Sequence, residues 1–284
     1  MRIFTFSGIN GGFVGQNDGV ELKYLARDFT TALSNLPLTY KGKDNEDHFR
    51  SSINWTTLLS QVGLATVLDG SPVLNEEADR LSQVIGPKLV SKQPTDPVEP
   101  ILILAHSQGT NVATFTLLWL LNNNPEFFKK RSVRCLFLDP KVGPNNVEEV
   151  FNRTGDLDLP FLFLQSEKDL LSRQGVLGTR FISQFHLGNH LFVSGLGHSD
   201  IVHWELLKDP KLRWLTRDGY HNKYLRDVQK ERVRISKERS RPGWTTSDSL
   251  RLERYMKKYP MNQESLIPGL LSFAKGSLLK RFSS

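Results

Sequence analysis

Short runs of consecutive hydrophobic residues recur along the chain and predict the strands of a sheet. The run Ile-Leu-Ile-Leu-Ala at 101–105 shows no alternation of polar and apolar positions. Such a run is typical of a strand that is buried on both faces of a parallel sheet. Comparable runs occupy 3–6, 133–138, 160–164 and 190–193, and a weaker one lies near 65–67. We therefore expect a sheet of about six strands.

Between these runs, apolar residues recur every three or four positions, which is the spacing of an amphipathic helix. The pattern predicts helices at 18–36, 75–90, 107–122, 147–152, 199–207 and 250–259. Strands that alternate with helices are typical of an α/β fold, here a three-layer sandwich around a mostly parallel central sheet. Because such folds bind ligands beyond the carboxyl ends of the strands, we expect the functional groups there.

Composition excludes several classes of protein. With 38% hydrophobic and 24% charged residues among 284, the chain is neither disordered nor fibrous. Its longest nearly apolar run, 113–121, is far shorter than the roughly 18 to 20 residues that a membrane span needs. The single cysteine, Cys135, excludes an intrachain disulfide and a zinc site built on cysteines. The first residues lack the apolar region of a signal peptide, so we expect a cytoplasmic protein.

The positive charge is concentrated near the C-terminus. Residues 221–284 contain 15 Lys/Arg and 6 Asp/Glu, whereas residues 1–220 contain 22 and 24. We therefore divide the chain into a body, 1–220, and a basic C-terminal extension, 221–284. The extension could contact an anionic membrane surface, where each basic residue adds about 1 kcal/mol. A solvated tail and a helix packed back on the body are the alternatives. Nucleic acid is a weaker prediction, because no recognition motif accompanies the aromatic residues Trp244 and Tyr255.

The strand at 101–105 leads through His106 and Ser107 into a predicted helix, in the sequence Ala105-His-Ser-Gln-Gly109. Small residues two positions before and after the serine allow a sharp turn that lifts its hydroxyl above the sheet. The amino end of the helix offers N–H groups to a developing oxyanion, and the N–H of Gln108 is the first expected donor. A serine that only caps the helix is the alternative interpretation.

This motif resembles the Gly-x-Ser-x-Gly pattern of the α/β-hydrolase superfamily of lipases and esterases, with Ala105 in place of the first glycine. The resemblance implies a compact α/β-hydrolase fold and a serine hydrolase that needs no metal and no organic cofactor. Only residues 140–159 separate the strand at 133–138 from the next, so we expect no large cap over the nucleophile. An open nucleophile suits a carboxylic ester, above all that of a lipid; a thioester or amide would also fit.

Two further strand ends complete a triad in the order serine, acid, histidine. Asp169 follows the strand at 160–164, and His198 follows the strand at 190–193. In this interpretation His198 takes the proton of Ser107, and Asp169 orients His198. Asp139, which ends the strand at 133–138 in a Leu-Asp-Pro sequence as in some lipases, is the alternative acid. We favour Asp169 because its spacing to His198 is the commoner arrangement.

The other histidines receive no catalytic role. We expect His106 to point away from the nucleophile or to line the site, and His203 to lie on the following helix. His186 and His190 flank a predicted strand and have no assigned partner.

The second oxyanion donor is expected in the loop that follows the first strand. That loop reads Ser7-Gly-Ile-Asn-Gly-Gly12, and the N–H of Ile9 is the candidate, with Asn10 and Gly11 as alternatives. A glycine-rich loop after a strand could instead bind a dinucleotide. The glycines at 8, 11, 12 and 15 do not match Gly-x-Gly-x-x-Gly, however. A rival from a different class is a non-catalytic protein of the same fold that interacts through its basic extension.

Overall fold

The computed structural model describes residues 1–8, 22, 24–29, 32, 46–50, 72–93, 99–129, 132–142, 144–154, 159–166, 189–193, 196–209, 214–216 and 266–275. Within these ranges the chain forms an α/β structure around one seven-stranded sheet, in the order β2-β1-β3-β4-β5-β6-β7. The bounds of the strands are β1 (Arg2–Ser7), β2 (Glu46–Arg50), β3 (Ile101–His106), β4 (Val133–Leu138), β5 (Phe161–Ser166), β6 (Asn189–Val193) and β7 (Trp214–Thr216).

All neighbouring strands from β2 to β6 pair in parallel, and only β7 runs antiparallel, against β6. Every residue of β3, β4 and β5 is buried. This burial explains why their sequences are continuous apolar runs, because both faces of a central parallel strand are covered. The predicted mostly parallel sheet is confirmed.

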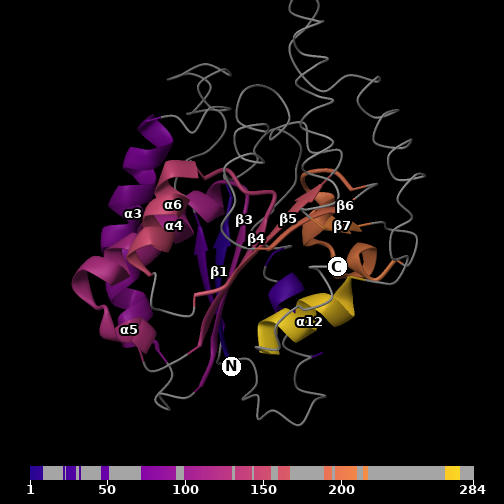
Figure 1. Ribbon diagram of the computed structural model, residues 1–284, viewed down its shortest axis with the longest axis horizontal. Coiled ribbons are helices and arrows are strands. Elements are labelled where there is room, and N and C mark those ends of the chain that lie inside the picture. Colours follow the sequence, from indigo (N-terminus) through magenta and orange to yellow (C-terminus); the bar gives the residue numbers. More distant parts are fainter. Residues whose placement is uncertain are drawn as a thin grey trace, which may run out of the picture.

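Helices lie on both faces of the sheet (Figure 1). One face carries α3 (Pro72–Ser91), α4 (Gln108–Asn123), α5 (Glu126–Lys129) and α6 (Pro144–Arg153). On the other face lie η2 (Asp200–Val202), α9 (Trp204–Leu207) and α12 (Ile267–Lys275), together with helical residues 24–29.

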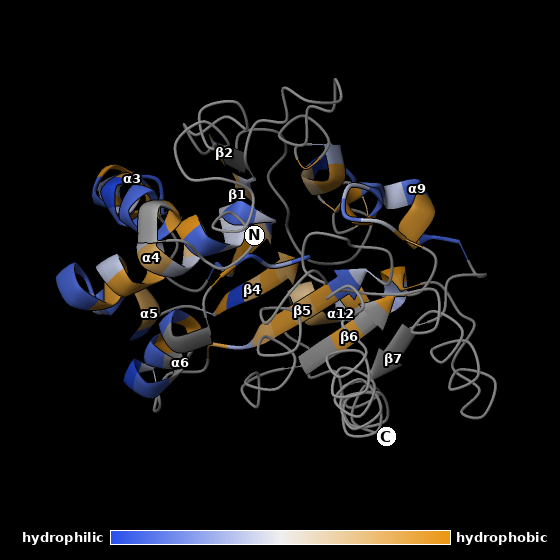
Figure 2. Ribbon diagram, turned by 90° about the horizontal axis from the view of Figure 1, so that it is seen from above, coloured by the Kyte–Doolittle hydropathy of each residue, from blue (hydrophilic) through white to orange (hydrophobic). Residues whose placement is uncertain are grey.

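Alternation along each strand divides the apolar side chains between two hydrophobic cores. In β3, Leu102 and Leu104 belong to the core under α9 and α12, whereas Ile101, Ile103 and Ala105 belong to the core under α3 and α4. Successive residues of a strand point to opposite faces, so one strand supplies both cores. Figure 2 shows the result: β5 is largely hydrophobic, and the outer surfaces of α3 and α6 are hydrophilic.

The described elements match most of the predicted ones, with three kinds of difference. The predicted helix at 199–207 is wrong as one element, because η2 and α9 are separate and His203 between them has an extended backbone. Strands β2 and β7 and helix α5 lie where the hydrophobic pattern predicted no element. The strand expected near 65–67 and the helix expected at 250–259 lie outside the described residues.

One part of the C-terminal extension packs against the body. The side chains of Leu266, Leu270, Phe273 and Ala274 are buried in the same core as strands β3 to β6. The guanidinium of Arg134, on β4, lies 5.9 Å from the ring centre of Phe273. Of the three interpretations of the extension, a packed helix therefore holds for α12. Residues 221–265 and 276–284 lie outside the described part of the chain. Among the described helices, none combines the length and the hydropathy that crossing a membrane requires.

Candidate active site

The site lies where the strand order reverses. Strand β1 has β2 on one side and β3 on the other, so the connections that follow β1 and β3 leave the sheet next to each other. The crevice beyond the carboxyl ends of such strands is the usual ligand site of an open parallel sheet. Ser107 follows β3 directly, and Gly8 follows β1 directly.

The backbone at Ser107 has an unusual conformation. Its φ is 53° and its ψ is −131°, a region in which residues other than glycine are uncommon. Conformations of this kind cost about 1–3 kcal/mol and persist only when the surroundings fix them. Here the Ser107 N–H donates a hydrogen bond to the Leu138 carbonyl at 3.0 Å, which extends the pairing of β3 and β4.

Two glycines give this turn the space that it needs. A Cβ atom on Gly109 would lie 2.0 Å from the Phe6 carbonyl oxygen, so only glycine lets α4 start this close to β1. A Cβ atom on Gly8 would lie 2.8 Å from the Cβ of Ser107. Gly8, the first residue after β1, therefore lies directly beside the serine side chain.

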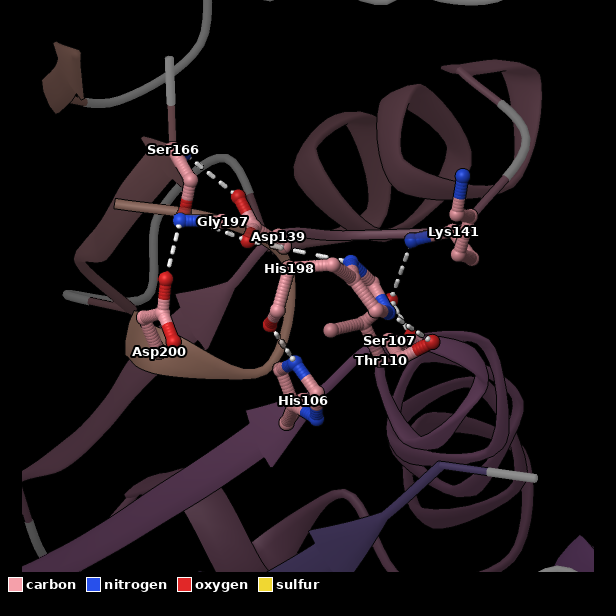
Figure 3. A network of polar contacts seen from close by, with 9 residues as sticks. All are labelled: His106, Ser107, Thr110, Asp139, Lys141, Ser166, Gly197, His198 and Asp200. Atoms are coloured by element: carbon pink, nitrogen blue, oxygen red, sulfur yellow. Dashed lines mark hydrogen bonds and ion pairs between the residues drawn. The ribbon is translucent and has the colours of Figure 1, made fainter. Parts of the chain in front are cut away.

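Ser107 stands at the N-cap position of α4 but makes no side-chain capping hydrogen bond. Its hydroxyl oxygen instead lies 2.8 Å from Nε2 of His198 (Figure 3). The interpretation of Ser107 as only a helix cap is therefore wrong. Helix α4 begins at the next residue, Gln108, so the backbone N–H groups of its amino end follow Ser107 directly in the chain.

His198 is held in a short turn between β6 and η2. The Gly197 N–H donates a hydrogen bond of 2.8 Å to the Asp200 carboxylate, and the Asp200 N–H donates one of 3.1 Å to the Gly197 carbonyl. These two bonds close the turn around His198. Its side chain is 13% exposed, so one edge of the imidazole can still meet a ligand.

Asp139 lies on the other side of the imidazole. Its Oδ2 is 3.7 Å from Nδ1 of His198, which is too long for a hydrogen bond. The carboxylate is fully buried and accepts two hydrogen bonds from Ser166, one from the backbone N–H at 2.5 Å and one from the hydroxyl at 2.6 Å. Two donors on one buried carboxylate stabilise its ionised form and fix its orientation.

The structure thus brings together Ser107, His198 and Asp139. Asp139 was the alternative acid in the sequence analysis. Asp169, the favoured acid, lies outside the described residues, as do the predicted oxyanion donor Ile9 and its alternatives Asn10 and Gly11. Gln108 occupies its predicted place at the start of α4, where its side-chain amide donates a hydrogen bond of 3.2 Å to the Leu74 carbonyl.

Sequence reasoning missed Ser166 and left the place of His106 open between two alternatives. Ser166 ends β5, and a lone serine at a strand end carries no signal of its partner across the sheet. His106 was expected to point away or to line the site. It is fully buried, and its Nε2 lies 2.8 Å from the His198 carbonyl oxygen. The strand alternation that places His106 on the face of Leu102 and Leu104 could have indicated this side of the sheet.

A metal ion is the other chemistry that this group of residues could support. His106, Asp139 and His198 each offer one ligand atom, and these atoms lie within 4.8 Å of one another. Both carboxylate oxygens of Asp139 already accept hydrogen bonds from Ser166, however, and Nε2 of His198 contacts the Ser107 hydroxyl. The arrangement fits a proton relay better than a metal centre.

No model of a known protein family matches this chain, and the search of curated proteins found no match either. Any function must therefore be argued from the geometry of the site.

Proposed function

We propose that this protein is a serine hydrolase of the α/β-hydrolase fold that cleaves a carboxylic ester. The observation that carries the proposal is the continuous contact from the Ser107 hydroxyl through His198 to Asp139. Each residue follows a different strand of one parallel sheet, and the chain order is serine, acid, histidine. This order and a serine on a strained strand-to-helix turn are the features of the resemblance to the α/β-hydrolases.

The roles follow from the contacts. Nε2 of His198 is in position to accept the proton of Ser107 as the hydroxyl oxygen attacks the carbonyl carbon of the ester. The same imidazolium then returns the proton to the alcohol that leaves, and the acyl group stays on Ser107. Water deprotonated by His198 attacks the acyl-enzyme, which releases the acid and restores the serine.

Asp139 is the acid of this triad in our proposal, in place of Asp169. Its carboxylate faces Nδ1 of His198, so it holds the imidazole with Nε2 toward the serine and stabilises the imidazolium. The distance of 3.7 Å is long. Catalytic hydrogen bonds without substrate are often long and shorten in the complex.

The oxyanion of the tetrahedral intermediate would lie at the amino end of α4. The Gln108 N–H is the first donor in this proposal, and the positive end of the helix dipole adds to it. The second donor comes from the segment after β1, for which Ile9 remains the candidate. The close approach of Gly8 to Ser107 supports this assignment.

A fluorophosphonate probe and short and long p-nitrophenyl esters test the proposal. Wild-type protein is expected to react with the probe and turn over an ester, whereas Ser107→Ala does neither, with a loss of about 10⁶-fold in kcat. Ser91→Ala is the matched control, because Ser91 is an exposed serine at the end of α3. A panel that includes phospholipids and triglycerides would then show whether the ester is that of a lipid.

Two outcomes would reject the proposal. Equal labelling of wild type and Ser107→Ala would mean that the serine is no nucleophile, and the non-catalytic interaction protein would become the better interpretation. Loss of turnover after treatment with a chelator, with recovery on adding zinc, would favour a metal centre at His106, Asp139 and His198.

A further inference from the structure

We propose that His106 is a positioning residue, which ties the turn carrying His198 to the strand that carries the nucleophile. The inference rests on the proposed function of Ser107 and His198. The Nε2 of His106 lies 2.8 Å from the backbone carbonyl oxygen of His198, so His106 acts on the turn and not on the substrate.

The place of His106 follows from strand geometry. His106 is the last residue of β3, and on alternating positions it shares a face with Leu102 and Leu104. That face packs on the segment containing Leu196, Ile201 and Val202, which brackets His198. The residue directly before the nucleophile is thereby buried against the turn that delivers the catalytic base, although 92 positions separate His106 from His198.

The hydrogen bond has a defined direction. A carbonyl oxygen only accepts, so Nε2 of His106 must carry the proton and donate it to the His198 carbonyl at 2.8 Å. The two imidazole rings lie 4.7 Å apart between their centres, with 38° between their planes. His106 therefore fixes the backbone of His198 through the bond and limits the tilt of its ring through the contact.

This link differs from the bonds that close the turn itself. The Asp200 carboxylate and the Gly197 N–H hold the shape of the turn, but both belong to it, so their bond does not connect the turn to the sheet. The bond from His106 connects the turn to β3, one residue from Ser107. It thus sets the distance between Nε2 of His198 and the serine hydroxyl, a distance at which a displacement of about 1 Å can cost about 100-fold in rate.

Three variants distinguish the effect of the hydrogen-bond donor of His106 from the effect of its ring shape. His106→Phe keeps a planar ring but removes the donor, His106→Gln restores an N–H at similar reach, and His203→Gln removes a histidine of the same segment. The readouts are kcat and KM for a short p-nitrophenyl ester, with active sites counted by the fluorophosphonate probe, and the melting temperature. We expect kcat per active site to fall about 10- to 100-fold in His106→Phe with KM within about twofold. In His106→Gln most of the kcat per active site should return, and the kcat of His203→Gln should equal that of wild type.

A purely structural role would lower the melting temperature and the count of active sites but leave kcat per active site unchanged. That result, or an equal loss of kcat in His106→Phe and His106→Gln, would overturn the proposal.

A second measurement does not depend on activity. In long-range ¹H–¹⁵N spectra of the imidazole rings, the resonances of His198 should shift or broaden in His106→Phe and return toward their wild-type positions in His106→Gln. Unchanged His198 resonances in His106→Phe would refute the positioning role. If the His198 resonances change in His106→Phe but the wild-type protein never reacts with the probe, the hydrolase proposal is refuted. The link between His106 and His198 then still stands.

Discussion

Gly8 and Gly109 both leave space around Ser107, but a side chain at each would collide with a different part of the molecule. At Gly109 the new Cβ would meet the backbone of Phe6, which cannot move without disturbing β1. We expect Gly109→Ala to destabilise the fold by about 3 kcal/mol or more. At Gly8 the new Cβ would meet the Ser107 side chain, so Gly8→Ala should lower kcat by about 10- to 100-fold at a smaller loss of stability. Urea unfolding and ester turnover of both variants check this difference; equal losses of stability would contradict it.

Asp139 gives a second prediction at the level of one side chain. Asp139→Asn keeps the shape but removes the charge that holds the His198 tautomer, and kcat should fall about 10⁴-fold with little change in KM. Asp169→Asn is the control and should stay within a few-fold of wild type. The opposite ranking of the two variants would return the role of the acid to Asp169.

Cys135 is buried in the core on the α4 side of the sheet, and burial raises the pKa of its thiol well above the ordinary value. Because the unfolded thiol ionises at lower pH than the folded one, its contribution to stability is present below the unfolded pKa and is lost as the pH rises above it. Between pH 8 and pH 10, wild type should therefore lose more unfolding free energy than Cys135→Ala, by at most about 1.4 kcal/mol per pH unit. Urea unfolding under reducing conditions measures it, and parallel pH profiles would count against the prediction.

At the scale of elements, the sequence predicts strands that are central and misses those at the edges. Runs such as Ile101-Leu-Ile-Leu-Ala are readable because both of their faces are buried. In the described sheet β2 is an edge strand and reads Glu-Asp-His-Phe-Arg, and its Phe49 packs on β1 against Phe4 and Phe6. Polar residues are usual on an edge strand, so the hydrophobic pattern of the sequence does not predict β2.

The sequence also predicts only part of the candidate site. Ser107 and His198 follow from local motifs, because a turn of small residues is visible in the sequence. The choice between Asp139 and Asp169 depends on which strand end faces Nδ1 of His198, and this is set by the packing of the turn at 197–200. Spacing along the chain holds no information on that packing.

Helix α12 covers one face of the sheet and contributes side chains to the core there. Leu270 is fully buried, whereas Leu271, one residue on, is only partly buried. Leu270→Ala should cost about 2–5 kcal/mol, and Leu271→Ala clearly less. Denaturant unfolding compares the two. If both substitutions were equally mild, α12 would not contribute to the core as the structure indicates.

At the scale of the whole molecule, the basic residues of 221–284 suggest an anionic lipid surface as a partner of the protein. Replacing Lys230, Arg232 and Arg234 by Gln should weaken binding to phosphatidylserine vesicles by about 100-fold, since each charge adds about 1 kcal/mol. Vesicle sedimentation measures it, and binding should also fall with added salt. A variant with three exposed lysines of the body replaced by Gln, Lys88, Lys92 and Lys129, is the matched control. Equal binding by the tail variant and wild type would rule out this contact.

The burial of α12 against strands that are synthesised much earlier, β3 to β6, also has a consequence for biosynthesis. A ribosome adds about 5–20 residues per second, so α12 is completed about 4 to 16 s after β6. During that interval the nascent chain would present uncovered leucines of β3, β4 and β5 to the cell. Chaperones are therefore expected to bind this protein late in translation, and a premature stop before residue 266 should yield aggregates rather than a smaller enzyme.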